Sequence, residues 1–473
     1  MGVMNKKQKI GIIIAIVILA ASILLPAPYG LSTAGMNTVG LTLFFLTLLI
    51  TEALPLSIGS LLTVGLMPLL GVSDNFAGGV VGFAHPVIFF IIASFGIATA
   101  ITSGTLTKRF LLLLLRRTGS VKGLLLALMV ATAGVSFFMS NIPACAIMLV
   151  VALEFVDMLE GEEKASVGRT FMIAVPVATM IGGMATPASS SLNLISISLL
   201  EYFTYTHDYL TYTTVSFVHW MAIGVPLVVV LIPVAWMLMC RVYKPTEVSP
   251  EIIDRFRENI RVQVAKPLVK KEIFTLIILG GMLALWIASS WVSGIEVFTV
   301  ALLGCVLLAM PGVRVLEGKA FVAAINWDII FLSGAILSIA AALTRNDVIS
   351  WLTDTLNLSA LSLPIVIAVG LAALVTFVML LLVTSAPALI SVLAAPFAAI
   401  AAASGVPPAY LFIALAFCAG NCYLFPLDTV QLLTYSKGYY RMTDMGRSTI
   451  FLQIMLVIIL ALWIPFMGWV LGI

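Results

Sequence analysis

The sequence predicts an all-α polytopic membrane protein with about eleven transmembrane helices and two re-entrant hairpins in two inverted repeats. Of 473 residues, 62% are hydrophobic and only 10% are charged, with a mean hydropathy of +1.18. Soluble domains carry about 25% charged residues. Proline and polar residues interrupt apolar sequence twice, within Ser136–Met148 and Val383–Ala388. Basic residues cluster in a few short segments, as topology signals do.

The composition also limits the class of protein and its cofactors. The net charge is only +3, and the short basic segments do not predict a nucleic-acid-binding surface. We expect no metal cofactor, because the cysteines show no zinc-ligand spacing and should pack inside helices. They are Cys145, Cys240, Cys305, Cys418 and Cys422.

Charges beside the apolar segments give the orientation of the N-terminal part. Lys6, Lys7 and Lys9 place the N-terminus in the cytoplasm by the positive-inside rule. The apolar run Ile10–Leu25 lacks a small-residue cleavage site, so it is predicted to be a retained first helix and not a signal peptide. The next helices are expected at about 38–53, 55–71 and 86–104, followed by a basic cytoplasmic loop.

The first interrupted stretch, SFFMSNIPACAIM, predicts a re-entrant hairpin within about 123–157. Both flanks are basic, so both ends are expected on the cytoplasmic side. The region is too short for two spans of about 20 residues each. Pro143 ends or kinks a helix, and polar groups at this depth require surrounding protein or water. Back-bonding to the helix is the alternative for Ser136 and Ser140.

The fifth predicted helix begins near Thr170 and is also interrupted. Its segment Gly182–Asn193 (GGMATPASSSLN) combines glycine, proline and three serines, which predicts a broken helix. Close packing through small residues is the alternative explanation. A sixth helix at about 214–240 leads into a charged cytoplasmic segment. The predicted units are therefore a first helix in 1–37, a first repeat in 38–240, a linker in 241–271 and a second repeat in 272–473.

The second half repeats this order with opposite orientation. Neither flank of its hairpin, at about 361–403, is basic, so this hairpin is expected to enter from outside. The interval from Ser140 to Ser189 resembles that from Thr384 to Asp428, so a tip and a broken helix recur together. Inverted repeats of this kind indicate an elevator or rocking secondary carrier. The remaining helices are predicted at about 272–291, 295–310, 327–343, 409–435 (broken) and 449–470, with the C-terminus outside.

Five segments together resemble one family of carriers. They are Thr51–Leu62, Leu106–Gly119, Ser136–Ala144, Ile181–Asn193 and Lys437–Met445. In this order they look like the divalent anion:sodium symporter family of the wider ion transporter superfamily, which also holds arsenite and sodium/proton carriers. The resemblance covers nearly the whole chain. It implies a homodimer in the plasma membrane that moves a small anion.

The resemblance also implies a first cation site. Each hairpin tip of that family carries Ser-Asn-Thr, which binds sodium and substrate carboxylates. The first tip here is Ser140-Asn141-Ile142, and the second is Thr384-Ser385-Ala386, which keeps a hydroxyl but lacks the asparagine. The implied sodium ligands are Ser136, Ser140, Asn141 and Ser189. The full cation-binding set adds Thr384, Ser385 and Asp428.

The substrate-binding set follows from the same comparison. The family's Thr-Pro-Pro-Asn is here Ser190-Ser191-Leu192-Asn193, and the matching part of helix 10 is Asp428–Gln431. The implied substrate ligands are Asn141, Ser190, Asn193, Ser385, Asp428 and Thr429. Helix N-termini can hold an anion without lysine or arginine, and hydroxyls and amides complete the shell.

Asp428 is a further candidate because a carboxylate in a broken helix at membrane depth is a functional hypothesis by default. It would bind a cation or couple transport to protons, and a helix cap is the structural alternative. The favoured function is cation-coupled transport of di- or tricarboxylates, with Na⁺ or H⁺ as coupling ion. A sodium/proton antiporter and a sulfate or arsenite-like carrier remain alternatives. An enzyme is not expected, because no nucleophile–base pair occurs at membrane depth.

Overall fold

The computed structural model describes residues 6–115, 118–206, 214–292, 294–355, 363–382, 385–426 and 428–473. Every regular element in these ranges is a helix, which confirms the predicted all-α class. The candidate residue Thr384 lies outside the described residues.

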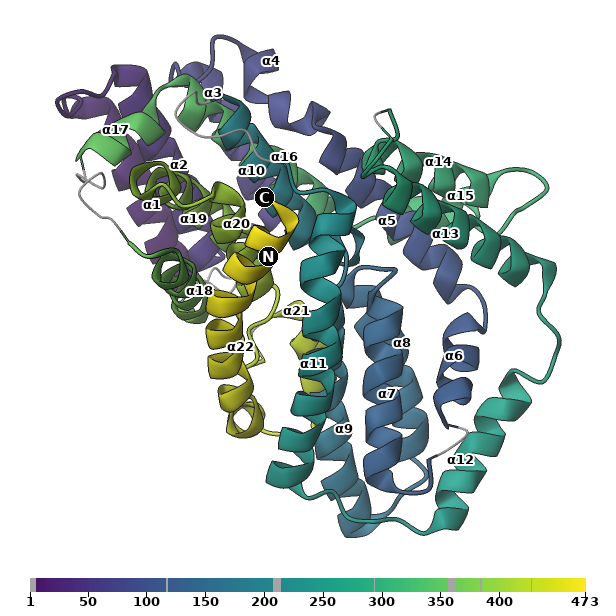
Figure 1. Cartoon of the computed structure of the whole chain (residues 1–473). Helices are drawn as coiled ribbons and strands as arrows, with labels where there is room; N and C mark the ends of the chain where they lie inside the picture. Colours follow the sequence, from purple (N-terminus) through teal and green to yellow (C-terminus); the bar gives the residue numbers. More distant parts are fainter. Residues whose placement is uncertain are drawn as a thin grey trace.

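The N-terminal helices form one end of the molecule (purple in Figure 1). α1 (Lys6–Leu24) packs along α2 (Thr33–Thr51), where a Cβ on Gly40 would lie 2.1 Å from Ser22 Oγ. Only glycine allows this close approach. The segment between the helices predicted at 55–71 and 86–104 contains two short helical turns. The elements that follow are α3 (Leu56–Leu69), α4 (Phe76–Gly79), η1 (Val81–Ala84) and α5 (Pro86–Thr102).

The two basic segments predicted as cytoplasmic loop and linker both contain helices. α6 (Leu106–Leu115) follows α5 after a bend of 62°. α12 (Pro250–Gln263) lies within the charged segment 241–271. Its apolar face is buried, and its Phe256 ring lies 5.2 Å from the Phe155 ring. Arg257 Nε donates to the Leu115 carbonyl at 3.1 Å, so the linker is docked against the preceding helices.

The first interrupted region forms the hairpin of α7 (Val121–Ser136) and α8 (Asn141–Val156). The broken helix consists of α9 (Gly161–Gly182), η2 (Pro187–Ser189) and α10 (Ser191–Thr206). The sequence placed its start near Thr170, nine residues too late. Glu162 and Glu163 occupy the first turn of α9, where carboxylates favour the helix dipole.

α9 is the central helix of this half. It packs against α7, α8, α11 (Phe217–Tyr243) and α21, and Figure 1 shows α7, α8, α9 and α11 running together. Of its most apolar 18-residue window, 83% is buried, against 22% for α13. α9 is therefore enclosed by protein, whereas α13 presents most of its apolar surface outward, as a lipid-facing helix does.

The second half has the same order of elements as the first. α13 (Lys270–Ala288) and α14 (Val297–Ala309) are followed by α15 (Gly318–Ala324), α16 (Trp327–Arg345) and α17 (Val348–Thr355). A second hairpin, a second broken helix and a long final helix complete the chain. They are α18 (Ile365–Leu382), α19 (Ala386–Ser404), α20 (Pro408–Ala419), α21 (Thr429–Tyr435) and α22 (Met442–Leu471). The inverted orientation of the two halves stays a prediction.

Seven helices in the described part of the chain are long and apolar enough to cross a membrane, and an eighth is added if bent α5–α6 counts as one. They are α2, α9, α11, α13, α16, α19 and α22. The prediction of eleven spans also counted segments that fold into shorter apolar helices. α3 and α14 have 14 and 13 residues, below the roughly 20 that a perpendicular span needs.

α11 closes over the break that follows α9. Trp220 Nε1 donates to the Met184 carbonyl at 3.1 Å, and a Cβ on Gly224 would lie 2.1 Å from that same oxygen. Because this oxygen belongs to the backbone, it cannot move aside as a flexible side chain would.

We predict that Gly224→Ala lowers the stability of the protein. Overpacking costs about 1–3 kcal/mol, although glycine to alanine inside a helix otherwise gains up to ~1 kcal/mol. Thermal unfolding of the purified protein in detergent measures the change. Gly65→Ala on α3, where no atom lies within 4 Å of the new Cβ, is the matched control. Equal unfolding temperatures for the two variants would contradict this account of the break.

Candidate functional site

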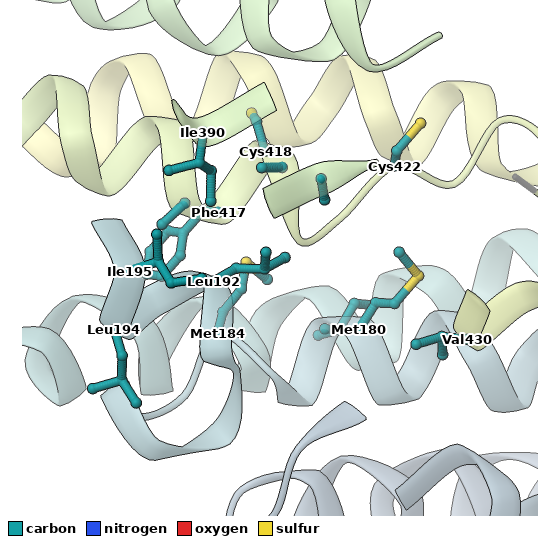
Figure 2. Packing of buried hydrophobic residues seen from close by; sticks show 14 of the residues in the cluster. Met180, Met184, Leu192, Leu194, Ile195, Ile390, Phe417, Cys418, Cys422 and Val430 are labelled. Atoms are coloured by element: carbon teal, nitrogen blue, oxygen red, sulfur yellow. The ribbon is translucent and has the colours of Figure 1, made fainter. Parts of the chain in front are cut away.

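The two broken helices and the first hairpin tip come together in the interior. A Cβ on Gly420, where α20 ends, would lie 3.6 Å from Leu192 Cδ1 at the start of α10. The Cys145 thiol, one turn after the first tip, donates to the Val430 carbonyl at 3.4 Å. Figure 2 shows the apolar contact around these breaks, with Met184, Leu192 and Phe417 among its side chains.

The first tip is built by the local sequence. α7 ends at Ser136 and α8 begins at Asn141, with Pro143 in the first turn, where its missing N–H removes no helical hydrogen bond. Ser136 is fully buried. Its Oγ lies 2.9 Å from the Thr179 carbonyl oxygen and 3.0 Å from Asn141 Oδ1. The tip therefore places a hydroxyl, an amide oxygen and a backbone carbonyl together.

The break after α9 forms the other side of this cluster. A Cβ on Gly183 would lie 2.4 Å from Asn141 Oδ1, so the amide rests directly on the Gly183 backbone. Ser189 Oγ lies 2.7 Å from the Gly183 carbonyl and 2.6 Å from the Thr186 carbonyl. Asn193 Nδ2 donates to the same two carbonyls at 2.8 and 2.9 Å. Side-chain and backbone oxygens thus form one buried polar cluster.

The structure brings four predicted residues of the first half together: Ser136, Asn141, Ser189 and Asn193. Two others have local roles. Ser140 is the N-cap residue of α8, but its side chain makes no capping hydrogen bond. Ser190 is buried, and its Oγ accepts from the Leu192 N–H at 3.3 Å, which supports the start of α10. The binding roles of all six residues remain predictions.

Three residues of the cluster were not identified from the sequence. Thr179 and Gly183 contribute backbone carbonyls, and Thr186 Oγ1 donates to the Phe137 carbonyl at 3.2 Å, which joins the break to the tip. Thr186 and Ser189 also form a capping box. The Gly-Gly pair and the Thr-Pro of GGMATPASSS were the available signals, because glycine permits close approach and Thr-Pro starts a new turn.

The second half is organised differently. Ser385 is the partly buried N-cap residue of α19 and makes no side-chain capping bond. Asp428 is the N-cap of α21: its Oδ1 accepts from the Val430 N–H at 2.8 Å, and Gln431 Oε1 accepts from the Asp428 N–H. This geometry supports the capping alternative for Asp428. Thr429 is exposed, and none of the contacts described for these three residues reaches the first cluster.

A second polar network holds the end of α20. Asn421 Nδ2 donates to the Phe417 carbonyl at 2.8 Å, and Asn421 Oδ1 accepts from the Tyr423 hydroxyl at 2.6 Å. From α22, Thr449 Oγ1 donates to the Tyr423 carbonyl at 2.7 Å, and Gln453 accepts from the Tyr423 N–H. The sequence predicted a broken helix at about 409–435 but not this network, because Thr449 and Gln453, the partners of Tyr423, lie on a different helix.

A cavity of about 230 Å³ lies beside the first tip. Ile142 and Pro143 line it on the tip side, and Thr99, Thr102 and Asn326 contribute polar groups from the other side. None of its lining residues carries a charge. The first tip, the break after α9 and this cavity offer neutral oxygen and nitrogen groups at interrupted helices.

Known proteins resemble this chain along its whole length. A model of the sodium:sulfate symporter transmembrane region matches residues 6–473. The sodium-dependent dicarboxylate transporter SdcS of Staphylococcus saprophyticus is 25% identical over 98% of this chain and 92% of its own length. SdcS of Staphylococcus aureus is 25% identical over 89% of this chain and 84% of its own.

Two solved structures share the fold. The YdaH transporter of Alcanivorax borkumensis has a TM-score of 0.60 at 16% identity, covering 99% of this chain and 98% of its own. MtrF of Neisseria gonorrhoeae has a TM-score of 0.55 at 13% identity, covering 98% and 95%. At these identities the likeness concerns the fold alone. The family model covers nearly all of the chain and confirms the resemblance to divalent anion:sodium symporters, so this chain belongs to the sodium:sulfate symporter family of membrane transporters.

Proposed function

We propose that this protein is a sodium-coupled secondary transporter of small dicarboxylates in the plasma membrane. The observation that carries the proposal is the buried cluster of Ser136, Asn141, Gly183, Ser189 and Asn193 at the junction of the first tip and the first broken helix. Relatives named as sodium-dependent dicarboxylate transporters support the choice of ion and substrate class.

The donor set suits sodium. In transporters, unwound backbone carbonyls coordinate Na⁺ where helices are interrupted. Here the Thr179 carbonyl lies beside Ser136 Oγ, which also contacts Asn141 Oδ1. The Gly183 carbonyl, on the other side of the Asn141–Gly183 contact, accepts from Ser189 Oγ and Asn193 Nδ2. The Ser136 hydroxyl, which donates in this structure, can turn its lone pairs toward a cation. Ser140, Thr384, Ser385 and Asp428 would complete the cation-binding residues of the two halves.

The anion would bind without lysine or arginine. α8, α10 and α19 begin at the tips and breaks. The first N–H groups of a helix have no partner further back in the helix, and the positive end of the helix dipole lies there. Bound sodium would add positive charge next to them. Ser190, Ser385 and Thr429 are proposed to contact the substrate together with Asn141 and Asn193, and the cavity beside Ile142 and Pro143 gives it room.

We further propose elevator-type movement by a homodimer with the N-terminus in the cytoplasm and the C-terminus outside. The hairpins and broken helices pack mainly on one another and on α11 and α22. α13 and α14, in contrast, pack chiefly on each other and on α5. Such a division would let the first group move as a unit.

Radiolabelled succinate uptake into proteoliposomes tests the function. We expect uptake driven by an inward sodium gradient, with sulfate competing weakly, and at least about a tenfold loss in Asn141→Ala, equivalent to ~1.4 kcal/mol. Accumulation of sulfate but not succinate would mean that the substrate is an inorganic anion and not a dicarboxylate. Sodium-driven proton flux without any anion would support the antiporter instead.

Gly183→Ala tests whether sodium binds where Asn141 meets the break. The new Cβ would displace the Asn141 amide, so the sodium concentration for half-maximal uptake should rise about tenfold or more, since hydrogen bonds to ions contribute about 1.5–3 kcal/mol. Gly281→Ala on α13, where no atom lies within 4 Å of the new Cβ, is the control. An unchanged sodium dependence in Gly183→Ala would place the cation elsewhere.

Asp428 is proposed to take part in coupling as well as to cap α21. Val430 links the carboxylate to the helix of the first tip: its N–H donates to Asp428 Oδ1, and its carbonyl accepts from the Cys145 thiol, one turn from Asn141. Asparagine caps a helix as well as aspartate does, whereas alanine costs about 0.5–2 kcal/mol. Asp428→Asn should therefore retain thermal stability but lose sodium-coupled uptake, and Asp428→Ala should lose both. Normal coupling in Asp428→Asn would leave Asp428 as a cap alone.

A further inference from the structure

A polar cavity of about 640 Å³ lies apart from the tips and breaks, at the basic end of the molecule. It is lined by the first turns of α9, the start of α22 and the connection 438–441 between α21 and α22. Three arginines line it: Arg169 from α9, and Arg441 and Arg447 from the start of α22. The segment Lys437–Met445 supplies much of the lining of this cavity. The transport function proposed above gives this segment no role.

The acidic groups of the lining leave the cavity with excess positive charge. Asp444 already accepts from the Arg441 N–H at 2.9 Å and lies 3.9 Å from Arg447. Glu162 is the other carboxylate of the lining and is exposed. Within the described part of the chain, no carboxylate lies within 4.0 Å of the Arg169 or Arg441 guanidinium. The lining therefore contains three arginines and two carboxylates, and one of these carboxylates, Asp444, already interacts with Arg441 and Arg447.

Arg169 gives an independent indication of a ligand. Its Nε is buried and has no hydrogen-bond partner, and its guanidinium carbon lies 5.7 Å from the centre of the Tyr243 ring. A buried donor of a charged group is unfavourable when it has no partner. An anion in the cavity would offset this by pairing with the rest of the guanidinium group, which lies against the Tyr243 ring.

We propose that this cavity binds a phosphate-bearing anion from the cytoplasmic side. Guanidinium groups match phosphate oxygens with paired hydrogen bonds, which ammonium groups do not. The Thr443 hydroxyl, also in the lining, can complete the shell, whereas the Tyr439 hydroxyl already donates to Asp157. The cytoplasmic location follows from the positive-inside rule. A phosphorylated metabolite and the headgroup of an anionic lipid share this chemistry.

A bound anion would join the two broken helices at their cytoplasmic ends. Tyr439 already packs on α9, where a Cβ on Gly168 would lie 2.4 Å from the ring. Tyr440 Oη lies 3.0 Å from Thr434 Oγ1 of α21. An anion held between Arg169 and Arg441 would bridge α9 to the α21–α22 connection. The site would thereby stiffen the helices that carry Gly183 and Asp428.

Binding of inorganic pyrophosphate to the purified protein tests the soluble source, and native mass spectrometry after reconstitution with phosphatidylglycerol or phosphatidylcholine tests the lipid source. We expect saturable pyrophosphate binding, or selective retention of phosphatidylglycerol, and a loss of about tenfold or more in affinity in Arg169→Gln and Arg441→Gln. Arg255→Gln removes the same charge from an exposed position on α12 and should bind normally.

The variant Asn141→Ala distinguishes this anion site from the transport site, because it should still bind the anion in the arginine-lined cavity while losing substrate uptake. The proposal is overturned if neither probe binds. It is also overturned if Arg255→Gln weakens binding as much as Arg169→Gln, since the effect would then be a general one of surface charge. Loss of binding in Asn141→Ala would overturn it too, by assigning the anion to the transport site.

Discussion

The contact between the Asn141 side chain and the Gly183 backbone is the constraint on which the rest of the structure depends. It joins the first hairpin tip to the break after α9, with no room for a Cβ between them. Both partners interrupt helices in the interior, where unpaired backbone groups are costly. The surrounding residues satisfy them: Ser189 and Asn193 donate to the Gly183 carbonyl, and Trp220 donates to the Met184 carbonyl. The break is therefore a stable feature and not a defect in a helix.

The two halves use different side chains to pair the polar groups at their interrupted helices. In the first half, the tip and the broken helix bond to each other directly: Ser136 donates to the Thr179 carbonyl, and Thr186 donates to the Phe137 carbonyl. In the second, Thr449 and Gln453 of α22 hold the Tyr423 backbone, and the Tyr423 hydroxyl donates to Asn421. Asp428 caps the helix that follows. The second break is thus supported from outside the hairpin. This difference agrees with a sequence that keeps asparagine at the first tip but has Ser385 at the second.

Local chemistry explains which elements the sequence predicted well. Both hairpins and both broken helices follow from proline and glycine, whose effects on the backbone do not depend on distant residues. Helices within charged segments were harder to predict from the sequence. α12 reads as a linker because charges dominate its composition, yet every third or fourth residue is apolar and packs on α6 and α8. The sequence analysis missed the start of α9 at Gly161 for the same reason, because charged residues occupy its first turns.

By itself, the sequence determined the class of protein, its approximate order of helices and the position of the first tip, because composition, proline and flanking charge act locally. Only the tertiary structure decided which polar groups meet. Three contacts join chain segments far apart in sequence: Asn141 with Gly183, Thr186 with Phe137, and Tyr423 with Gln453. The cavity of Arg169 and Arg441 arises in the same way, since helix packing and not spacing places two arginines 272 positions apart on one wall.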